Sequence, residues 1–320
     1  MASNMIEEEI VEAETECDQL KGPQAEPRQY DIIYFNILAL LYFHIAGIYG
    51  LYVCFLYAMW SSIFWNVLIF VIGNLGVTAG THRYWSHKAY KATRPLQVFL
   101  ILAHSVANQY SVARWVRDHR LHHKYSDTDA DPYNATRGFF YSHIGWLLVR
   151  KHPETGRRRK VIDMSDIYSD PLLKFQDQHS YWFLPLVIFI IPSCIPTLWG
   201  ESFTNAWHLN MLRYILNMNV IFCVNSFAHL WGLRPYDNHI APSQSPGVNI
   251  LTLGEGWHNY HHSFPWDYRS DEFGVRFNFN AWFIDVCAKL GLAYDLRTAS
   301  VEVIEARAER TGDGSRVKSL

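Results

Sequence analysis

The chain is poor in charged residues and has no closely spaced cysteines. Asp, Glu, Lys and Arg make up only 18% of its 320 residues, and the net charge of -2 argues against nucleic acid as a partner. Its five cysteines show no CxxC spacing, which argues against a disulfide framework and against a zinc ribbon. The sequence also lacks a Rossmann GxGxxG, a haem CxxCH and a protease HExxH. These absences exclude the common nucleotide, haem and zinc-peptidase motifs.

Apolar residues dominate what is present. Hydrophobic residues make up 49% of the chain, and it holds 12 tryptophans, which indicates extensive contact with lipid. Crossing a membrane takes about 20 residues, and four apolar stretches meet or approach that length: 33–56, 61–80, 181–199 and 206–226. Prolines interrupt the third stretch at Pro185, Pro192 and Pro196. We therefore expect an all-α integral membrane protein whose four transmembrane helices form two hairpins.

A shorter apolar run at 95–108 is better suited to an interfacial or re-entrant position.

The basic residues predict the orientation of the spans. Residues 81–180 hold 16 of the 28 Lys and Arg, whereas 57–60 and 200–205 hold none. The large loop and both termini should therefore lie in the cytosol.

This orientation divides the chain into six predicted parts. The acidic leader carries no apolar core of a signal peptide and should be disordered, and the cytosolic parts should form a helical cap on the membrane helices. The parts are the leader at 1–29, the first hairpin at 30–80, a cytosolic part at 81–180, the second hairpin at 181–228, a second cytosolic part at 229–298 and a polar tail at 299–320.

Nine histidines recur in a pattern that points to metal binding. Two groups read H-x-x-H-H, and the others are an H-x4-H and one separate histidine; the nine are His82, His87, His119, His122, His123, His229, His258, His261 and His262. On a helix the positions i, i+3 and i+4 share a stripe, so each triplet is expected to aim three imidazoles at one point. Nine imidazoles are too many for one ion, which predicts a dinuclear site.

The His82 and His87 pair and the separate His229 do not follow the H-x-x-H-H pattern. His82 and His87 are five residues apart, about 140° around an ideal α-helix, so we expect the helix to end between them, as Gly80 allows, or the pair to straddle a cavity. Asn225 precedes His229 by four residues and shares its stripe. Spans two and four are expected to end just before His82 and His229. Two spans separate His123 from His229, and this even number of crossings places all the groups on one membrane face.

Imidazole suits iron, zinc, copper and nickel, and no thiolate is present to favour zinc. Two ions of higher coordination number, with room for oxygen or water, make iron the better hypothesis. The remaining histidines are expected to stay outside the site; they are His44, His104, His143, His152, His179, His208 and His239.

Four strings carry a family resemblance, in this order: HRYWSH, HRLHHKYSDTDADPYNATRGFF, NSFAHLWG and LGEGWHNYHHSFPWDY. Between about residue 30 and residue 314 the chain resembles the membrane acyl-CoA desaturases, especially the insect branch and the stearoyl-CoA desaturases. The resemblance implies four spans in the endoplasmic reticulum and two iron ions held by the nine histidines, with Asn225 acting through water. It also implies formation of a cis double bond with O2, typically at carbon 9 or 11. The APSQ at 241–244 resembles the variable signature of insect desaturases outside the common delta-9 groups, some of which make pheromone precursors.

Partners follow from the resemblance and from the missing redox motifs. Electrons must come from outside the chain, and the resemblance implies cytochrome b5 with its NADH-dependent reductase. The basic cytosolic face could dock an acidic donor, although a basic loop also follows from topology alone. The substrate is implied to be a long-chain acyl-CoA, whose phosphates suit Arg and Lys.

The resemblance implies five contacts with the coenzyme A moiety, namely Asn36, Arg117, Asp118, Arg150 and Lys151. Other residues depart from the family or lie around the expected acyl tunnel, and they should govern chain length and double-bond position: Asn74, Tyr84, Gln109, Tyr110 and Phe222. Asn74 should lie near the buried end of the tunnel.

Three alternatives stay open at this point. A fatty-acid hydroxylase or an alkane monooxygenase would share the histidines and the iron. A histidine-rich metal transporter would need ligands near the middle of the membrane, where only His44 is expected. A zinc protease fits poorly, because Glu255 precedes His258 with the wrong spacing.

Overall fold

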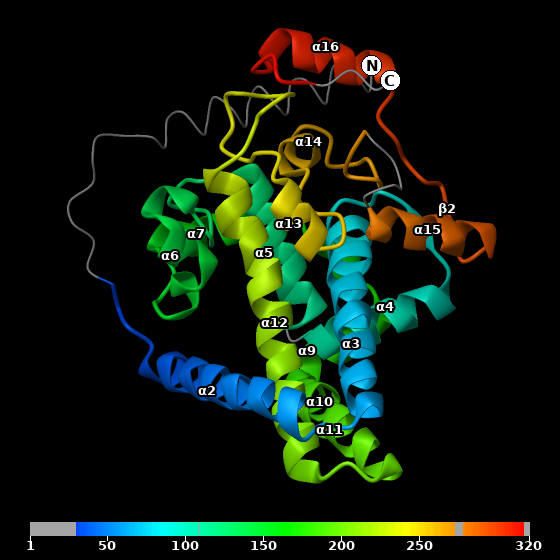
Figure 1. Cartoon of the computed structure of the whole chain (residues 1–320). Helices are drawn as coiled ribbons and strands as arrows, with labels where there is room; N and C mark the ends of the chain where they lie inside the picture. Colours follow the sequence, from blue (N-terminus) through cyan, green and yellow to red (C-terminus); the bar gives the residue numbers. More distant parts are fainter. Residues whose placement is uncertain (1–29, 108, 273–277, 317–320) are drawn as a thin grey trace.

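The computed structural model describes residues 30–107, 109–272 and 278–316 (Figure 1). The predicted leader at 1–29 and the last residues of the predicted tail lie outside these ranges. In chain order the elements are α2 (Tyr34–Leu56), α3 (Trp60–Leu75), η1 (Gly76–Ser86), β1 (Lys91–Ala92), α4 (Arg94–Ala107), α5 (Val112–Lys124), η2 (Ala135–Arg137), α6 (Phe139–His143), η3 (Gly145–Leu147), α7 (Pro153–Arg158), η4 (Arg159–Val161), α8 (Ser165–Tyr168), α9 (Pro171–Gln178), α10 (Ser180–Pro185), η5 (Leu186–Ile190), α11 (Ile191–Cys194), η6 (Ile195–Trp199), α12 (Phe203–Leu230), α13 (Pro246–Leu251), α14 (His258–Ser263), α15 (Phe279–Lys289), β2 (Ala293–Tyr294) and α16 (Val301–Thr311).

Four helical stretches are long and apolar enough to cross a membrane, as predicted: Tyr34–Leu56, Trp60–Ser86, Ser180–Trp199 and Phe203–Leu230. The third is broken into α10, η5, α11 and η6 because its prolines lack the N–H of a regular α-helix and clash with the preceding turn. The helix α4 has 14 residues and is too short to span.

The second and fourth spans are longer than predicted. The helix that begins at Trp60 continues through His82 to Ser86, and α12 continues through His229 to Leu230. The prediction that both helices end before these histidines is therefore wrong. Hydropathy marks only the lipid-facing length of a helix, whereas these helices continue into the protein, where polar side chains are buried.

The first predicted hairpin does not form as expected. Both of its helices lie wholly within the described residues, and α2 packs on α12 instead of along α3 (Figure 1). Glycines explain this choice: a Cβ on Gly50 would lie 2.0 Å from the carbonyl oxygen of His208 in α12, and one on Gly47 would lie 2.4 Å from Cδ1 of Ile215. Small residues let two helices approach closely in this way. The second hairpin does form, because η5, α11 and η6 pack on α12.

The histidine-bearing helix α5 lies beside the upper part of α12, between it and the α3 helix, and α14 lies above them (Figure 1). The C-terminal helix α16 crosses the top and fixes the segment that supports α14. Thr311 Oγ1 donates to the carbonyl oxygen of Tyr236 at 2.7 Å, and Arg307 pairs with Asp237. The backbone N–H of Tyr236 donates in turn to Oδ1 of Asn259 in α14 at 2.9 Å. The C-terminal segment is thus part of the framework that holds the histidine triplet of α14.

The contact between the second span and α4 leaves no room for a side chain at Gly76. A Cβ there would lie 2.0 Å from the backbone nitrogen of His104 and 2.2 Å from the carbonyl carbon of Ala103. Overpacking typically costs about 1–3 kcal/mol, and here the obstructing atoms are backbone. We expect Gly76→Ala to lower the unfolding temperature of the purified protein sharply. The matched control is Gly156→Ala, where no atom lies within 4 Å of the added Cβ. Equal unfolding temperatures for the two variants would contradict the packing argument.

Candidate metal centre

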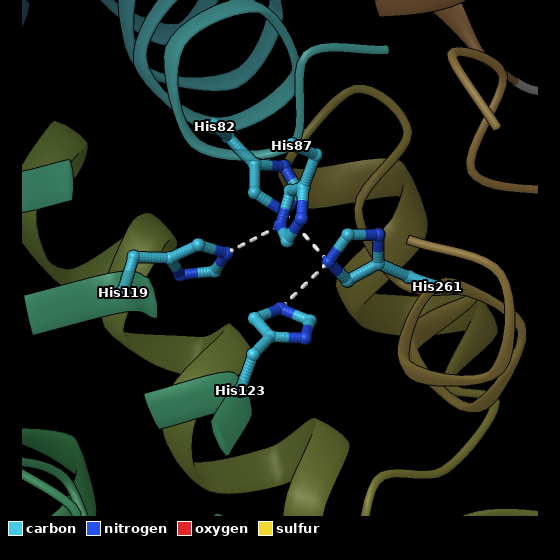
Figure 2. Close-up of side chains that lie close together, drawn as sticks. All are labelled: His82, His87, His119, His123 and His261. Carbon is cyan, nitrogen blue, oxygen red and sulfur yellow. Dashed lines mark hydrogen bonds between the residues drawn. The ribbon is translucent and has the colours of Figure 1, made fainter. Parts of the chain in front are cut away.

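The nine predicted histidines meet in two adjacent groups. The first holds His82, His87, His119, His123 and His261, and the second holds His122, His229, His258 and His262. In each group the candidate ligand atoms all lie within 4.8 Å of one another. Figure 2 shows the five imidazoles of the first group turned toward a common centre. Among the described residues the other seven histidines belong to neither group.

Each H-x-x-H-H triplet divides between the two groups. In α5, His119 and His123 enter the first group and His122 enters the second. In α14, His258 and His262 enter the second group and His261 enters the first. The prediction that each triplet aims at one point is therefore wrong. Adjacent residues of an α-helix point about 100° apart, so the second and third histidines of a triplet, at i+3 and i+4, diverge, and two such helices can bracket two ions.

A π-helix explains the spacing of the first histidine pair. The element η1 is a π-helix, whose backbone bonds join residues five apart. The N–H of His87 donates to the carbonyl oxygen of His82 at 3.2 Å, and the two rings lie 5.0 Å apart between centroids. The helix does not end at Gly80, and the pair does not straddle a cavity, so neither alternative of the prediction is correct. The helix widens to a turn in which residues five apart lie on the same face.

Three carboxylates hold histidines of these groups by Nδ1, and sequence reasoning missed them. Glu255 lies 2.7 Å from His82 Nδ1, Asp131 lies 2.9 Å from His122 Nδ1, and Asp127 lies 2.9 Å from His229 Nδ1. A carboxylate in this position accepts the Nδ1 proton, so it fixes the tautomer and turns Nε2 inward. For Asp127 and Asp131 the available signal was the acidic run YSDTDAD, which follows the triplet His119, His122 and His123.

The Nε2 atoms converge in a way that hydrogen bonding alone does not explain. His261 Nε2 lies 2.8 Å from His82 Nε2 and 3.0 Å from His123 Nε2, and His258 Nε2 lies 3.1 Å from both His229 and His262. Because His82 and His229 donate through Nδ1, their Nε2 atoms present lone pairs. Two ligands about 2.1 Å from one ion and at a right angle lie about 3 Å apart.

The donor set therefore fits a pair of metal ions. Nε2 of His122 supports this reading, because it is buried, has no hydrogen-bond partner among the described residues and faces the second group. All nine donors are imidazole nitrogens, with no thiolate among them.

Burial keeps most of these imidazoles in the form that binds metal. Removal from water, together with the neighbouring rings, lowers the pKa well below its usual value for His119, His123, His258, His261 and His262. Neutral imidazole is the ligand form, so these rings lose no proton when a metal binds. For His122 burial acts in the same direction, but Asp131 outweighs it and raises the pKa.

Two small cavities adjoin the histidines. The reaction cavity, about 40 Å³, touches both groups and is lined by Val77, Thr78, His82, Trp115, His119, His122, Ile221, Val224, Asn225, Thr252, Glu255 and His258. The inner cavity, about 30 Å³, is lined by Gln109, Tyr110, Arg114, Trp115, Asp118, His119, Tyr133, Trp146, Ile221, Phe222 and Asn225. Asn225, one turn before His229, lines both cavities.

Three larger cavities lie farther out. The basic cavity, about 360 Å³, is lined by Ile33, Asn36, Tyr110, Arg114, Trp146, Leu147, Val149, Arg150 and Lys151. The lateral cavity, about 250 Å³, lies between α2 and α12 and is lined by Phe35, Asn36, Ala39, Leu40, Phe43, Gln109, Tyr110, Trp146, Leu147, Tyr214, Met218 and Phe222. The outer cavity, about 330 Å³, is lined by Tyr110, Ser111, Ala113, Arg114, Arg117, Tyr168, Asp177, Ser180, Tyr181 and Leu184.

The residues predicted to bind the substrate headgroup are therefore distributed over several cavities. Asn36, Arg150 and Lys151 meet in the basic cavity, whereas Arg117 lines the outer cavity. Asp118 lines the inner cavity and pairs with Arg159 at 2.7 Å.

The residues predicted to line the acyl tunnel also lie in different parts of the structure. Gln109, Tyr110 and Phe222 line both the inner and the lateral cavity. Asn74 and Tyr84 line none of the five cavities described above. Asn74 is fully buried and donates to the carbonyl oxygen of Phe70 in its own helix, and Tyr84 packs with Trp85 and Tyr90.

Comparison with known proteins identifies the family. The fatty acid desaturase family model matches residues 59–278. An acyl-CoA Delta(11) desaturase of Spodoptera littoralis is 57% identical over 300 residues, which cover 93% of this chain and 89% of that protein. A (11Z)-hexadec-11-enoyl-CoA conjugase of Bombyx mori is 54% identical, covering 93% and 91%. Stearoyl-CoA desaturase 5 of Bos taurus is 48% identical, covering 92% and 88%. A match of this extent shows that the chain belongs to the fatty acid desaturase family.

Proposed function

We propose that the chain is an acyl-CoA desaturase of the endoplasmic reticulum membrane, with both termini in the cytosol. It forms a cis double bond in a saturated long-chain acyl-CoA. One O2, two electrons and two protons convert a –CH2–CH2– unit into –CH=CH– and two waters. Cytochrome b5, reduced by an NADH-dependent reductase, supplies the electrons. The observation that carries the proposal is the reaction cavity, where both histidine groups and apolar side chains share one wall.

Two iron ions are the proposed occupants of the histidine groups. When bound, they activate O2 for removal of hydrogen from an unactivated methylene, which is the part of the reaction that side chains cannot supply. An all-imidazole shell without thiolates suits iron better than a closed structural zinc site. His82, His87, His119, His123 and His261 would hold one ion. His122, His229, His258 and His262 would hold the other, with Asn225 acting through water.

The chain's own residues position the substrate and exclude bulk water. Val77, Ile221 and Val224 supply apolar walls to the reaction cavity, and Trp115 lies between it and the inner cavity. An acyl chain held along these walls would present one methylene pair to both histidine groups. Restricting the chain to one such position is what makes attack at a single pair of carbons possible.

The coenzyme A headgroup would bind at the basic cavity. Arg150, Lys151 and Arg114 bring three cationic side chains to its wall, where phosphate groups would form charge-assisted hydrogen bonds. Lys151 donates to the carbonyl oxygen of Pro132 at 2.8 Å, and burial lowers its pKa to about 7. An arriving phosphate would restore its full charge. Asn36, which donates to Leu147 O at 2.6 Å, lines the same cavity.

The double-bond position is proposed to be carbon 11 or carbon 9. Three relatives at 52–57% identity are Delta(11) desaturases, whereas a Delta-9 desaturase of Acheta domesticus is 46% identical, which favours carbon 11. A role in pheromone precursor synthesis would follow from that position. Gln109, Tyr110 and Phe222 are the proposed tunnel residues that border the inner cavity.

Expression in a yeast strain that lacks its own desaturase tests the reaction. We expect growth without added unsaturated fatty acid and a new monounsaturated acyl chain. Gas chromatography with mass spectrometry of double-bond adducts gives the position. A hydroxylated chain with no olefin would instead support the hydroxylase alternative. Double bonds at scattered positions would contradict the proposed fixed register of the acyl chain.

A further inference from the structure

One side chain lies where four cavities meet. Tyr110 lines the inner, lateral, basic and outer cavities, and Arg114 lines all of these except the lateral one. The guanidinium of Arg114 lies 3.6 Å above the centroid of the Tyr110 ring. We infer that Tyr110 is a gate, held by Arg114, that admits an acyl chain only when an anionic headgroup engages Arg114. This inference rests on the proposed acyl-CoA substrate.

The cavity volumes require side chains to move before an acyl chain can enter. The inner and reaction cavities, about 30 and 40 Å³, have room for only a few water molecules each. The basic, lateral and outer cavities are about 360, 250 and 330 Å³. A long acyl chain that starts in the basic cavity therefore cannot reach the histidines unless a side chain at the boundary moves.

The other large side chains at this boundary are held in place. Trp146 is 5% exposed, donates through Nε1 to the carbonyl oxygen of His143 and lies beneath the Lys151 ammonium at 4.1 Å. Phe222 is 3% exposed on α12 and packs edge-on against Trp146. Tyr110 is only half-buried. Of these three rings it is the one with space to move.

The backbone of Tyr110 is fixed while its side chain is not. Its φ is +66°, a conformation that costs free energy for a residue other than glycine or asparagine. The buried His104 donates through Nε2 to the Tyr110 carbonyl oxygen at 3.0 Å, and its Nδ1 contacts Thr81 Oγ1 at 2.7 Å. The next residue, Ser111, caps α5 by accepting from the N–H of Arg114 at 3.3 Å. With its own carbonyl group and the next residue anchored, the ring can swing by rotation of its own side-chain bonds.

Arg114 couples this movement to the headgroup. Its guanidinium touches the ring on one side and lines the basic cavity, with Arg150 and Lys151, on the other. A hydrogen bond between a guanidinium and a phosphate is stronger than an exposed cation–π contact. A phosphate-bearing headgroup would draw Arg114 away from the ring and release it. A chain without phosphate would leave the ring in place, so the gate would discriminate by induced fit.

The test compares two thioesters that differ in their phosphates. Radiolabelled stearoyl-CoA and stearoyl-pantetheine are bound to the purified full-length protein, and association rates are measured by rapid filtration. We expect the wild type to bind the CoA ester at least tenfold faster. Tyr110→Asn, which tolerates a positive φ, should admit both esters at similar rates. Arg114→Gln should lose the same discrimination, and its side chain is exposed, so folding should be unaffected. Tyr110→Phe keeps the ring and should retain the discrimination between the two esters.

The outcomes separate the gate from the substrate. If the wild type discriminates and Tyr110→Asn discriminates equally, the gate is wrong while the acyl-CoA substrate stands. Loss of discrimination in Tyr110→Phe would also overturn the gate, because it would assign the effect to the hydroxyl. If the wild type binds neither ester, the proposed substrate is wrong and the gate fails with it.

Discussion

The His261→Ala variant should lose all olefin formation above background while it still inserts into the membrane. His261 is the imidazole whose Nε2 contacts two other Nε2 atoms of the first group, those of His82 and His123, at 2.8 and 3.0 Å. Its removal takes away a ligand from the middle of the group and leaves a cavity on the inner face of α14. Because both histidine groups line one reaction cavity, loss of either ion should stop the reaction. His122→Ala, which empties one position of the second group, should have the same effect.

Two measurements accompany that prediction. Acyl chains from expressing yeast are analysed by gas chromatography with mass spectrometry, and iron per purified protein is measured by elemental analysis. The matched control is His179→Ala, a histidine outside both groups whose ring contacts the carbonyl oxygen of Phe175 at 2.9 Å. Wild-type product from either His261→Ala or His122→Ala would show that the two groups do not form one reaction centre.

The fold was predictable where lipid decides it and unpredictable where packing decides it. Four apolar lengths gave the four spans because the hydrocarbon thickness fixes how many residues a helix needs. The partner of α2 is determined instead by small residues, because Gly47 and Gly50 allow α12 to approach closely. A count of apolar residues does not reveal this contact. The predicted ends of the second and fourth spans were too early because packing decides these ends as well. His82 and His229 are polar, yet they lie within helices that continue into a buried site.

The site was predictable in its ligand types and not in its pairing. Histidine spacing identified nine residues that the fold brings together. It could not show that a π-helix makes a five-residue spacing equivalent to one turn, because that depends on how η1 packs against α4 and α5. Nor could it reveal Asp127 and Asp131. Their contacts with His229 and His122 are set by the loop that follows α5.

The carboxylates divide unequally between the two groups, and this gives the two proposed metal positions different electrostatic surroundings. The second group has two carboxylates, Asp131 on His122 and Asp127 on His229. The first has Glu255 on His82, and this carboxylate is shared with the buried guanidinium of Arg83 at 2.7 Å. Arg83 and His82 outweigh burial and bring the pKa of Glu255 to about 2. The negative charge beside the first group is therefore largely neutralised, whereas the second group keeps more of its own.

The Asp131→Asn variant should bind the metal of the second group about 10- to 100-fold more weakly, the usual effect of losing a carboxylate that orients a histidine ligand. Asp131 accepts from His122 Nδ1 at 2.9 Å and from the backbone N–H groups of Asp127 and Tyr133 at 2.8 and 2.9 Å. An asparagine can accept from Tyr133, but its NH2 would then face the two remaining donors.

Iron content should fall from two ions toward one per chain, with a matching loss of product. The Asp131→Asn substitution should lower the stability of the metal-loaded protein much more than that of the chelator-stripped protein. Part of the loaded protein's stability comes from binding the metal, and the substitution weakens that binding. Asp129→Asn is the control, because it lies in the same loop and its carboxylate approaches His152, outside both groups, at 3.9 Å. Full iron content in Asp131→Asn would show that the His122 ring is oriented by packing alone and would remove the argument for two unequal metal positions.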